Sequence, residues 1–584
     1  MEYNQDNKRS LRFGVLCSGT SFQRWQATAI RELIAHGHQV VVRVTDGRSE
    51  RRVGRMQRLA RKQFRTLLFS VLENRIFRPP AKALTDLSDG FNNLPSITCT
   101  VTKRGYSEYF DPADVATIRE YRPDFLLRFG FGILRGDILS AARYGVWSFH
   151  HDDELKYRGG PAGFWEIFQG DPVSGAILQR LTDRLDGGII LRKGYLKTVG
   201  HSWKGNLEQL LTVSAYWPAQ VADEIAANPD RNDTMPGQAS QTGAPLFRVP
   251  GNLDMLYFLA LLVRNRIRFY FRELFRAEIW NVGIIRQPVA EVARAGRPLS
   301  ALEVEWLPPA GRKRYLADPF GYTDDRGLHI LAEDYRYENR RAGISEILLP
   351  GHPDRVPPPR QGPPTPIGSP HPDRVPANDV HLSYPFVFQE NGEVYCLPEA
   401  SESRRLTLYR LDKTSGKFVI DRVLLQEISA VDPTLVFFRD RWWLFFTTRP
   451  CSNTHLFVYH APSLDAEFRP HLLNPVKVDI RSARPAGTPF LHEGTLYRPA
   501  QDSSRTYGGR VIINRIVSLT PDDFREEVAG TLEPPAGCRF RHGLHTLSAV
   551  GTVTLIDGKT YRFLPGHMIH QIRERIAGKE GSRG

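Results

Sequence analysis

One stretch of the sequence gathers polar side chains of the kinds that acid–base chemistry uses. It reads WSFHHDDELKYRGGPAGFWEIFQGD, from Trp147 to Asp171. A second short segment, RLDGG, follows at 184–188 and contains Asp186. A histidine can give or take a proton near neutral pH, and a carboxylate can orient it or accept that proton. His150 and Asp186 are therefore candidates for one catalytic cleft.

The elements around these residues predict how they are positioned. Short apolar runs alternate with helical patterns, which indicates a parallel sheet covered on both faces. The expected strands are 11–16, 39–44, 124–129 and 144–149, and the expected helices include 22–36, 112–121 and a long one at 203–227. Ligands of such sheets bind beyond the carboxyl ends of the strands. His150 directly follows the strand 144–149.

The segment 11–199 resembles the formyltransferase superfamily that uses 10-formyltetrahydrofolate. The family pattern is Asn-x-His, an Arg-Gly-x-x-Pro loop and Leu-Asp-x-Gly, and this chain has SFH at 148–150, YRGGP at 157–161 and LDGG at 185–188. The segment RPDFLLRFGFGIL at 122–134 matches the family's preceding strand and loop. The resemblance implies a Rossmann-like α/β fold. It also implies that the folate lies against Phe131, Gly132, Arg158, Gly159, Gly160 and Pro161.

The same resemblance implies roles for three residues. When an amine attacks the formyl carbon, negative charge develops on the oxygen, and a hydrogen-bond donor must meet it. His150 would be that donor, and Asp186 would hold His150 and assist proton removal. The family's Asn is Ser148 in this chain. Because one lost donor costs about 2.7–4 kcal/mol, two interpretations stay open: a formyltransferase that uses Ser148 as a third catalytic group, and a decayed site.

A metal site is not predicted. His150, His151 and Asp152 are adjacent, but no further ligand follows at a spacing typical of metal sites.

From about Trp280 the pattern changes to short aromatic strands with a weak internal repeat. The repeat reads ADPFGY, SYPFVF, VDPTLVF, GTPFLH and HTLSAV, beginning at residues 317, 383, 431, 487 and 545. Repeats that begin about 50 residues apart are typical of propeller blades, so the five copies predict an all-β five-bladed propeller. This region resembles the N-terminal region of plant glucosamine inositolphosphorylceramide transferase and, more distantly, five-bladed glycosidases.

Two functions of the propeller stay open. The first is a binding platform for glycans lined by aromatic side chains, namely Tyr395, Trp442, Trp443 and Tyr497. The second is glycan processing by paired carboxylates, for which Asp318, Glu399 and Asp432 are the candidates.

These observations predict an α/β Rossmann-like formyltransferase domain at 10–228 and a linker at 229–252. An amphipathic basic helix at 253–278 and a five-bladed β-propeller at 279–575 follow, with a disordered proline-rich insertion at 350–378. The predicted activity is formyl transfer from 10-formyltetrahydrofolate to an amine, chiefly that of an amino sugar or glycolipid.

Composition and charge indicate where the protein is located in the cell and what it binds. The chain has 584 residues, a formal net charge of +14 and five scattered cysteines, which together with its polar N-terminus predict a cytoplasmic protein. Two stretches are basic: 48–78 has ten Lys and Arg against two Glu, and 253–276 has five Arg against two acids. Both read as amphipathic helices with three possible roles: they meet an anionic membrane surface, which would place the protein at the inner face of the membrane, they meet a phosphorylated substrate, or they are packing helices with a solvated basic face. No specific nucleic-acid binding is predicted.

Overall fold

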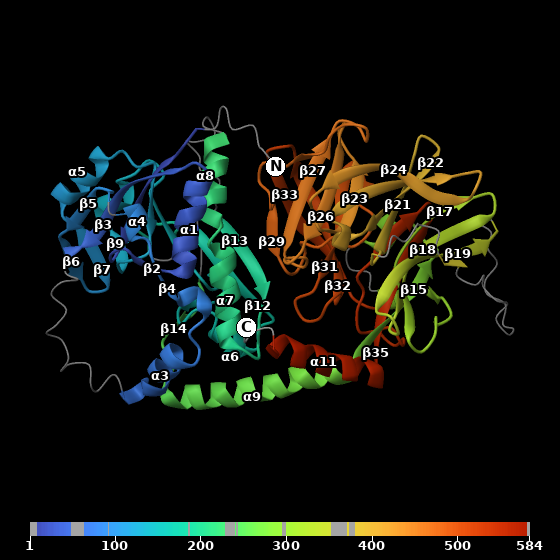
Figure 1. Cartoon of the computed structure of the whole chain (residues 1–584), viewed down its shortest axis with the longest axis horizontal. Coiled ribbons are helices and arrows are strands. Elements are labelled where there is room, and N and C mark those ends of the chain that lie inside the picture. Colours follow the sequence, from blue (N-terminus) through green and yellow to red (C-terminus); the bar gives the residue numbers. More distant parts are fainter. Residues whose placement is uncertain are drawn as a thin grey trace. The chain divides into compact units, whose positions relative to one another are not determined.

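The computed structural model describes residues 9–47, 64–91, 93–184, 187–227, 240, 243–294, 299–351, 371–372 and 380–580. The chain divides into two compact units, Met1–Ile267 and Arg268–Gly584, termed here the N-terminal and C-terminal units. The first is an α/β unit and the second consists mainly of β-strands (Figure 1). This order of fold classes confirms the prediction.

The N-terminal unit is built on a sheet in the order β13-β12-β10-β8-β1-β3-β5. The five strands from β10 to β5 are parallel, β12 is antiparallel to β10, and β13 is antiparallel to β12. Parallel strands are covered on both faces, which is why they read as apolar runs. The bounds are β1 Arg12–Cys17, β3 Gln39–Asp46, β5 Ser96–Cys99, β8 Phe125–Arg128, β10 Val146–His150, β12 Val173–Arg180 and β13 Ile189–Lys197.

Helices cover the two faces of this sheet through separate cores. On one face, Val115 and Ile118 of α5 (Pro112–Glu120) pack with Leu126 of β8. On the other, Trp25 of α1 (Arg24–Ala35) packs with Leu207 of α7 (Trp203–Ser214). The single helix predicted at 203–227 is wrong. It is two helices, α7 and α8 (Trp217–Ala227), because a proline at position 218 fits only the first turn of a helix.

Smaller elements complete the N-terminal unit. They are β2 Ser21–Gln23, β4 Leu84–Asp86, β6 Val101–Arg104, β7 Ser107–Phe110, β9 Ile133–Arg135, β11 Arg158–Gly159, β14 Leu246–Phe247, α3 Leu67–Arg75, α4 Ser88–Phe91 and α6 Trp165–Gln169. The long helix α9, Asn252–Phe275, contains the boundary between the units. Of the first predicted basic helix, residues 48–63 lie outside the described residues, as do 229–239 and 241–242 of the predicted linker.

The C-terminal unit contains five antiparallel sheets of four or five strands in its described residues. The first sheet is β16 Glu305–Trp306, β15 Ala277–Ile285, β35 Val553–Arg562 and β34 Leu547–Val550, and the second is β17 Arg314–Asp324, β18 Gly327–Arg336, β19 Arg341–Pro350 and β20 His371–Pro372. The third sheet is β21 Ser383–Glu390, β22 Glu393–Glu399, β23 Arg405–Asp412 and β24 Lys417–Gln426, and the fourth is β25 Ala430–Phe437, β26 Trp442–Thr448 and β27 His455–Ala461, with β28 Arg469–Pro470 and β29 Lys477–Asp479 both beside β27. The fifth sheet is β30 Phe490–His492, β31 Thr495–Asp502, β32 Arg510–Leu519 and β33 Phe524–Leu532.

The first and last strands of this unit lie in one sheet. β15 pairs with β35 over nine residue pairs, from Ala277↔Arg562 to Ile285↔Thr554. The sequence repeat begins in β17, β21 and β25, and its last two copies include β30 and β34. Two short helices, α10 Val289–Val292 and α11 Pro565–Glu580, complete the unit. Most of the predicted proline-rich insertion, 352–370 and 373–379, lies outside the described residues.

Candidate functional site

The predicted catalytic side chains of the N-terminal unit lie at the end of β10. Side chains alternate along a strand, so Ser148 and His150 share one face, and Trp147 lies on the other against Phe125, with ring centroids 3.8 Å apart. Ser148 is buried, whereas about a quarter of the His150 side chain is exposed. His150 is the last residue of β10, at the carboxyl end of a parallel strand, where ligands of such sheets bind.

Arg128, the last residue of β8, holds Ser148. Its Nη1 donates to Ser148 Oγ at 2.7 Å, and its Nη2 donates to the Phe131 carbonyl oxygen at 3.1 Å. A serine hydroxyl both donates and accepts. Because a guanidinium can only donate, it occupies a lone pair of Ser148 and leaves the hydroxyl hydrogen to donate elsewhere. The sequence did not single out Arg128, although it lies within the segment that carries the family resemblance.

His150 lies between the start of the glycine-rich loop and a buried carboxyl pair. Its Nε2 is 3.4 Å from the Tyr157 carbonyl oxygen and 3.9 Å from Asp152 Oδ2. Burial raises the pKa of Asp152 to about 8 and, with Asp152 beside it, raises the pKa of Glu166 well above its ordinary range. Burial therefore favours the protonated form of both groups. Glu166 was missed, although it is the one charged residue in the apolar run GFWEIF.

The neighbours of His150 in the sequence have structural partners. His151 is 3.0 Å from Ser214 Oγ and stacks on Phe149, and burial lowers its pKa to about 3. Asp153 forms an ion pair with Lys193 Nζ at 2.9 Å. The polar cluster seen in the sequence thus separates into one accessible histidine and several packed groups.

The predicted folate loop begins as strand β11, which pairs in parallel with β14. Gly159 has φ +98°, and a Cβ there would collide with the Phe247 carbonyl oxygen, so only glycine fits. Arg158 Nη1 donates to the Ala244 carbonyl oxygen at 3.3 Å. Gly160 and Pro161 follow at the surface side of the loop, both partly buried.

The other two predicted folate contacts, Phe131 and Gly132, interact with residues of the N-terminal unit. The Phe131 ring packs 5.1 Å from that of Phe110, and the Gly132 amide donates to Glu108 Oε2 at 2.5 Å. The predicted partner of His150, Asp186, lies outside the described residues, as does Leu185.

The C-terminal unit has a second group of candidates at equivalent positions of its repeat. Asp318, Tyr384 and Asp432 have φ of +47°, +44° and +49°, and each lies at a shift of strand register. Left-handed backbone at a residue other than glycine costs about 1–3 kcal/mol and is concentrated at functional sites. The same strained conformation therefore recurs in β17, β21 and β25, and two of the three residues are carboxylates.

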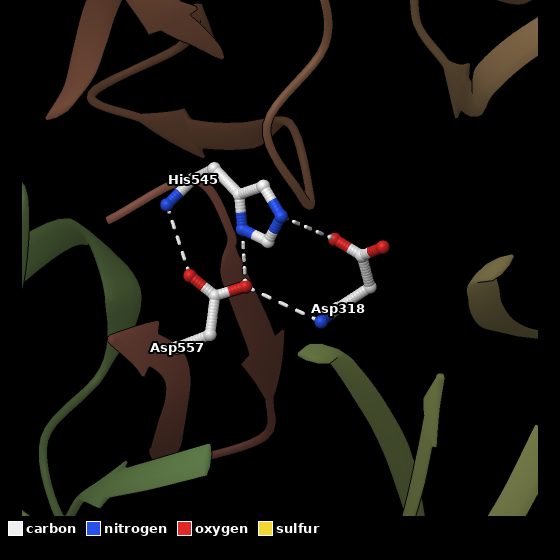
Figure 2. Close-up of side chains that lie close together, drawn as sticks. All are labelled: Asp318, His545 and Asp557. Carbon is white, nitrogen blue, oxygen red and sulfur yellow. Dashed lines mark hydrogen bonds and ion pairs between the residues drawn. The ribbon is translucent and has the colours of Figure 1, made fainter. Parts of the chain in front are cut away.

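Asp318 faces a histidine that a second aspartate orients (Figure 2). Asp557 Oδ2 lies 2.5 Å from His545 Nδ1, and His545 Nε2 lies 3.6 Å from Asp318 Oδ1. The ring stacks on Trp280 with centroids 3.9 Å apart. Burial opposes charge on His545, but Asp557 and Asp318 outweigh it and raise its pKa; burial raises the pKa of Asp318 to about 6.

The atoms of Asp318, His545 and Asp557 lie close enough to hold a metal ion. However, the two ring nitrogens face different carboxylates, and one ion takes only one of them. The arrangement therefore fits an Asp–His–Asp chain of ion pairs. Asp557 was missed, because Asp-Gly at 557–558 looks like a turn yet lies within β35.

Two further predicted carboxylates, Glu399 and Asp432, are neighbours. Asp432 binds Arg484 through both oxygens, at 2.6 and 3.1 Å, and its amide donates to Glu399 Oε2 at 3.2 Å. Burial, followed by the charge of Asp432, raises the pKa of Glu399 to about 8. Glu333 of β18 is close to Asp318, Glu399 and Asp432, and burial raises its pKa well above the ordinary range. We term Asp318, Glu333, Glu399 and Asp432 the carboxylate cluster.

The predicted aromatic platform is wrong for its two tryptophans. Trp442 and Trp443 are buried in two different cores, and Trp443 Nε1 donates to the Phe438 carbonyl oxygen at 3.1 Å. Tyr395 and Tyr497 stack on Phe388 and Phe490, with ring centroids 5.3 and 5.4 Å apart. Aromatic side chains therefore fill the sheets, because they bury the most apolar area for each residue.

Comparison with known proteins follows this division of the chain. Residues 375–542 match the family model for the N-terminal region of glucosamine inositolphosphorylceramide transferase 1. The rice (Oryza sativa subsp. japonica) protein of that name is 33% identical over 210 residues, which are 32% of this chain and 28% of the rice protein. Methionyl-tRNA formyltransferase of Acetivibrio thermocellus is 33% identical over 101 residues, which are 17% of this chain and 32% of that protein.

Both predicted resemblances are confirmed. Among solved structures, glycinamide ribonucleotide transformylase 1 from Symbiobacterium toebii matches with 17% identity and a TM-score of 0.24, over 38% of this chain and 89% of that one. The chain thus spans only about a quarter to a third of the curated relatives it matches, each of which is named as a transferase. Within the described residues, none of the helices combines the length and apolar character needed to cross a bilayer.

Proposed function

We propose that the N-terminal unit transfers a formyl group from 10-formyltetrahydrofolate to a primary amine. The observation that carries this proposal is the placement of Ser148 and His150 on one face at the end of β10, with His150 beside the start of the glycine-rich loop. The resemblance to formyltransferases indicates 10-formyltetrahydrofolate as the formyl donor. The site has hydrogen-bond donors that could bind the oxygen of the formyl group.

Two available hydrogen-bond donors, on Arg128 and Ser148, could bind the oxygen of a formyl group. Arg128 Nε is buried and has no hydrogen-bond acceptor among the described residues. Ser148 accepts from Arg128, so its own hydrogen remains available to an incoming oxygen. A carbonyl oxygen that gains negative charge during acyl transfer needs such donors, fixed in advance of the reaction.

The chain's residues then act as follows. The bound folate supplies an activated formyl carbon; the amine nitrogen forms a bond to it, the bond from that carbon to the folate nitrogen breaks, and the amine proton moves to that nitrogen. Ser148 and His150 donate to the formyl oxygen, and Arg128 strengthens Ser148 as a donor. Asp186, by resemblance, orients His150 and relays the proton.

We propose an amino sugar, free or in a glycolipid, as the acceptor. Support comes from the C-terminal unit, because its relatives are named glucosamine inositolphosphorylceramide transferases. A unit that binds such a glycan would bring an amine to the formyltransferase site. This assignment rests on similarity alone.

We also propose that the five sheets of the C-terminal unit are blades of a propeller. Contacts between successive sheets support this arrangement: Tyr384 Oη is 2.9 Å from Thr434 Oγ1 and accepts from the Gly487 amide at 2.7 Å. Gly487 in turn pairs with Leu547, and Thr546 Oγ1 donates to Asp318 at 2.8 Å. These contacts join β21 to β25 and to the segment before β30, that segment to β34, and the residue before β34 to β17. The ring of Phe320 in β17 lies 4.8 Å from that of Tyr384 in β21, which completes the circuit. The shared sheet of β15 and β35 would then join the two ends of the ring.

A second candidate function is glycan processing by the carboxylate cluster. The observation in its favour is the difference between its members: burial raises the pKa of Glu399 to about 8 and that of Asp318 to about 6, whereas Asp432 is paired with Arg484. One protonated and one ionised carboxyl group are what acid-catalysed glycoside cleavage requires.

The test of formyl transfer uses the full chain with 10-formyltetrahydrofolate and a panel of nucleotide-linked and lipid-linked amino sugars. Mass spectrometry then follows gain of a formyl group on the acceptor and loss of the donor. We expect His150→Ala to lower the rate about 10²–10⁴-fold, with His201→Ala of the same unit as the control. Equal rates in the wild type and His150→Ala would refute the mechanism. No turnover by the wild type would support the decayed-site interpretation.

A further inference from the structure

Helix α9 has two apolar faces, and one of them is exposed. Met255, Phe258 and Leu262 are buried against Phe164 and Trp203. The members of the opposite stripe are three, four or seven residues apart, which places them on one side of the helix. Its exposed fractions are 81% for Leu253, 55% for Leu256, 59% for Val263, 64% for Ile267 and 55% for Phe271.

The two stripes lie on opposite sides of α9. Leu256 precedes Phe258 by two residues, and a helix turns by about 200° over two residues at 3.6 residues per turn. The inner face continues to Asn265, whose Nδ2 donates to the Gly200 carbonyl oxygen at 2.8 Å. Packing within the unit thus uses one side of α9 and leaves the outer stripe uncovered.

Arginines lie beside the outer stripe in the second half of α9 and just after its end. Arg264, Arg266, Arg268, Arg272 and Arg276 are all exposed, and only Asp254 and Glu273 oppose them in 252–276. A long side chain beside an apolar stripe can reach past it with its charged end. An apolar stripe with basic residues on both sides is the pattern of helices that lie in the interfacial layer of an anionic membrane.

Helix α3 lies beside the start of α9 in the N-terminal unit. Asn252, at the start of α9, accepts from the Leu68 amide at 3.2 Å and donates to the Phe64 carbonyl oxygen at 2.7 Å. The two helices accordingly lie side by side (Figure 1). Exposed apolar side chains occur here as well, on Phe64, Leu67 and Val71.

We infer that the outer stripe of α9 docks the protein on an anionic lipid membrane, with α9 parallel to the surface. The apolar side chains would enter the boundary between headgroups and acyl chains, and the arginines would meet lipid phosphates. Charge complementarity selects this occupant, because a stripe bordered by five arginines repels a second copy of itself. The inference stands independently of the proposed formyl transfer.

The test is flotation of the full chain with vesicles of phosphatidylcholine, alone or mixed with phosphatidylglycerol. We expect binding only to the mixed vesicles, weakened by salt. The double variant Val263→Asp/Ile267→Asp should lower the bound fraction at least tenfold. Reversal of Arg264 and Arg268 to Glu should weaken binding about fivefold for each arginine.

The matched control is Ile420→Asp/Val528→Asp, because these two strand residues are 59% and 64% exposed, like Val263 and Ile267. The control should bind as the wild type does, and thermal unfolding should show all variants folded. Equal binding by Val263→Asp/Ile267→Asp and the control would overturn the inference. The inference would also be overturned if the wild type did not bind vesicles but formed a dimer through the same stripe, as measured by light scattering. Binding of RNA through the stripe in place of vesicles, as measured by gel shift, would overturn it as well.

Discussion

The site at the end of β10 and the carboxylate cluster place reactive groups in different ways. In the N-terminal unit, Ser148, His150 and the loop at Arg158 lie within residues 148–161. The end of β10 positions the first two, and pairing of β11 with β14 positions the loop. In the C-terminal unit, Asp318, Glu399 and Asp432 come from separate sheets. A contiguous site keeps its recognisable spacing in the sequence, whereas a dispersed one depends on how the sheets pack.

Protonation also differs between the two regions. The accessible group of the first site is a histidine, and its reactive partner is a serine polarised by Arg128. In the second region, burial dominates and shifts carboxyl groups toward the protonated form. Formyl transfer needs hydrogen-bond donors to an oxygen, and glycoside cleavage needs a protonated acid, so each region suits a different chemistry.

The largest expected effect is on glycan turnover, and it distinguishes this activity from formyl transfer. Asp318→Asn should lower any glycan turnover by about 10³-fold, since asparagine cannot take or give the proton, and leave formyl transfer unchanged. Asparagine tolerates the left-handed backbone at this position, so the fold should persist. Hydrolysis of a panel of aryl glycosides and oligosaccharides measures the effect. Asp440→Asn, at an exposed residue with φ +61°, is the matched control. Turnover that survives in Asp318→Asn would contradict the second function.

The next effect concerns Ser148. Ser148→Ala should lower the rate of formyl transfer about 10²–10³-fold, because one donor to the oxygen is lost. Ser148→Asn restores an amide donor and should keep most of the activity. Ser140 is the control, since it too accepts a hydrogen bond from an arginine, Arg119, yet is exposed. If Ser148→Ala and Ser140→Ala were equally active in steady-state kinetics, Ser148 would have no catalytic part.

The smallest effect is on stability. The pKa of Glu399 is raised from 4.5 to about 8, so the folded protein holds this proton more tightly than the unfolded chain does. Stability must therefore fall as pH rises through that window, by at most about 1.4 kcal/mol for each pH unit. Glu399→Gln should flatten the dependence of Tm on pH, and Glu390→Gln, at the partly exposed end of β21, should not. An unchanged slope in Glu399→Gln would show that Glu399 stays ionised.

Local patterns were enough to find the main elements and the first site. The apolar runs predicted β1, β3, β8 and β10, and His150 was placed correctly at a strand end. Arg128 was not singled out, because its contact with Ser148 depends on the register between β8 and β10. Register between strands distant in the sequence is set by packing and leaves no local signal.

Aromatic residues of the C-terminal unit were misread for a related reason. Trp442 and Trp443 alternate along β26, and each faces a different core. A strand with both faces buried has the same composition as an exposed aromatic platform, so the sequence offers no means to distinguish them. Asp557 was missed because Asp-Gly is a strong turn signal, which the pairing of β35 with β15 overrides.

The order of an α/β unit and a β unit, the β10 motif and the basic helix α9 follow from the sequence, since periodicity and spacing are properties of neighbours along the chain. Only the tertiary structure decided that Arg128 holds Ser148, that His545 bridges Asp318 and Asp557, and that one apolar stripe of α9 is left exposed. Each of these joins or separates groups far apart in the chain, and such distances arise only when the packing of sheets and helices fixes which surfaces meet.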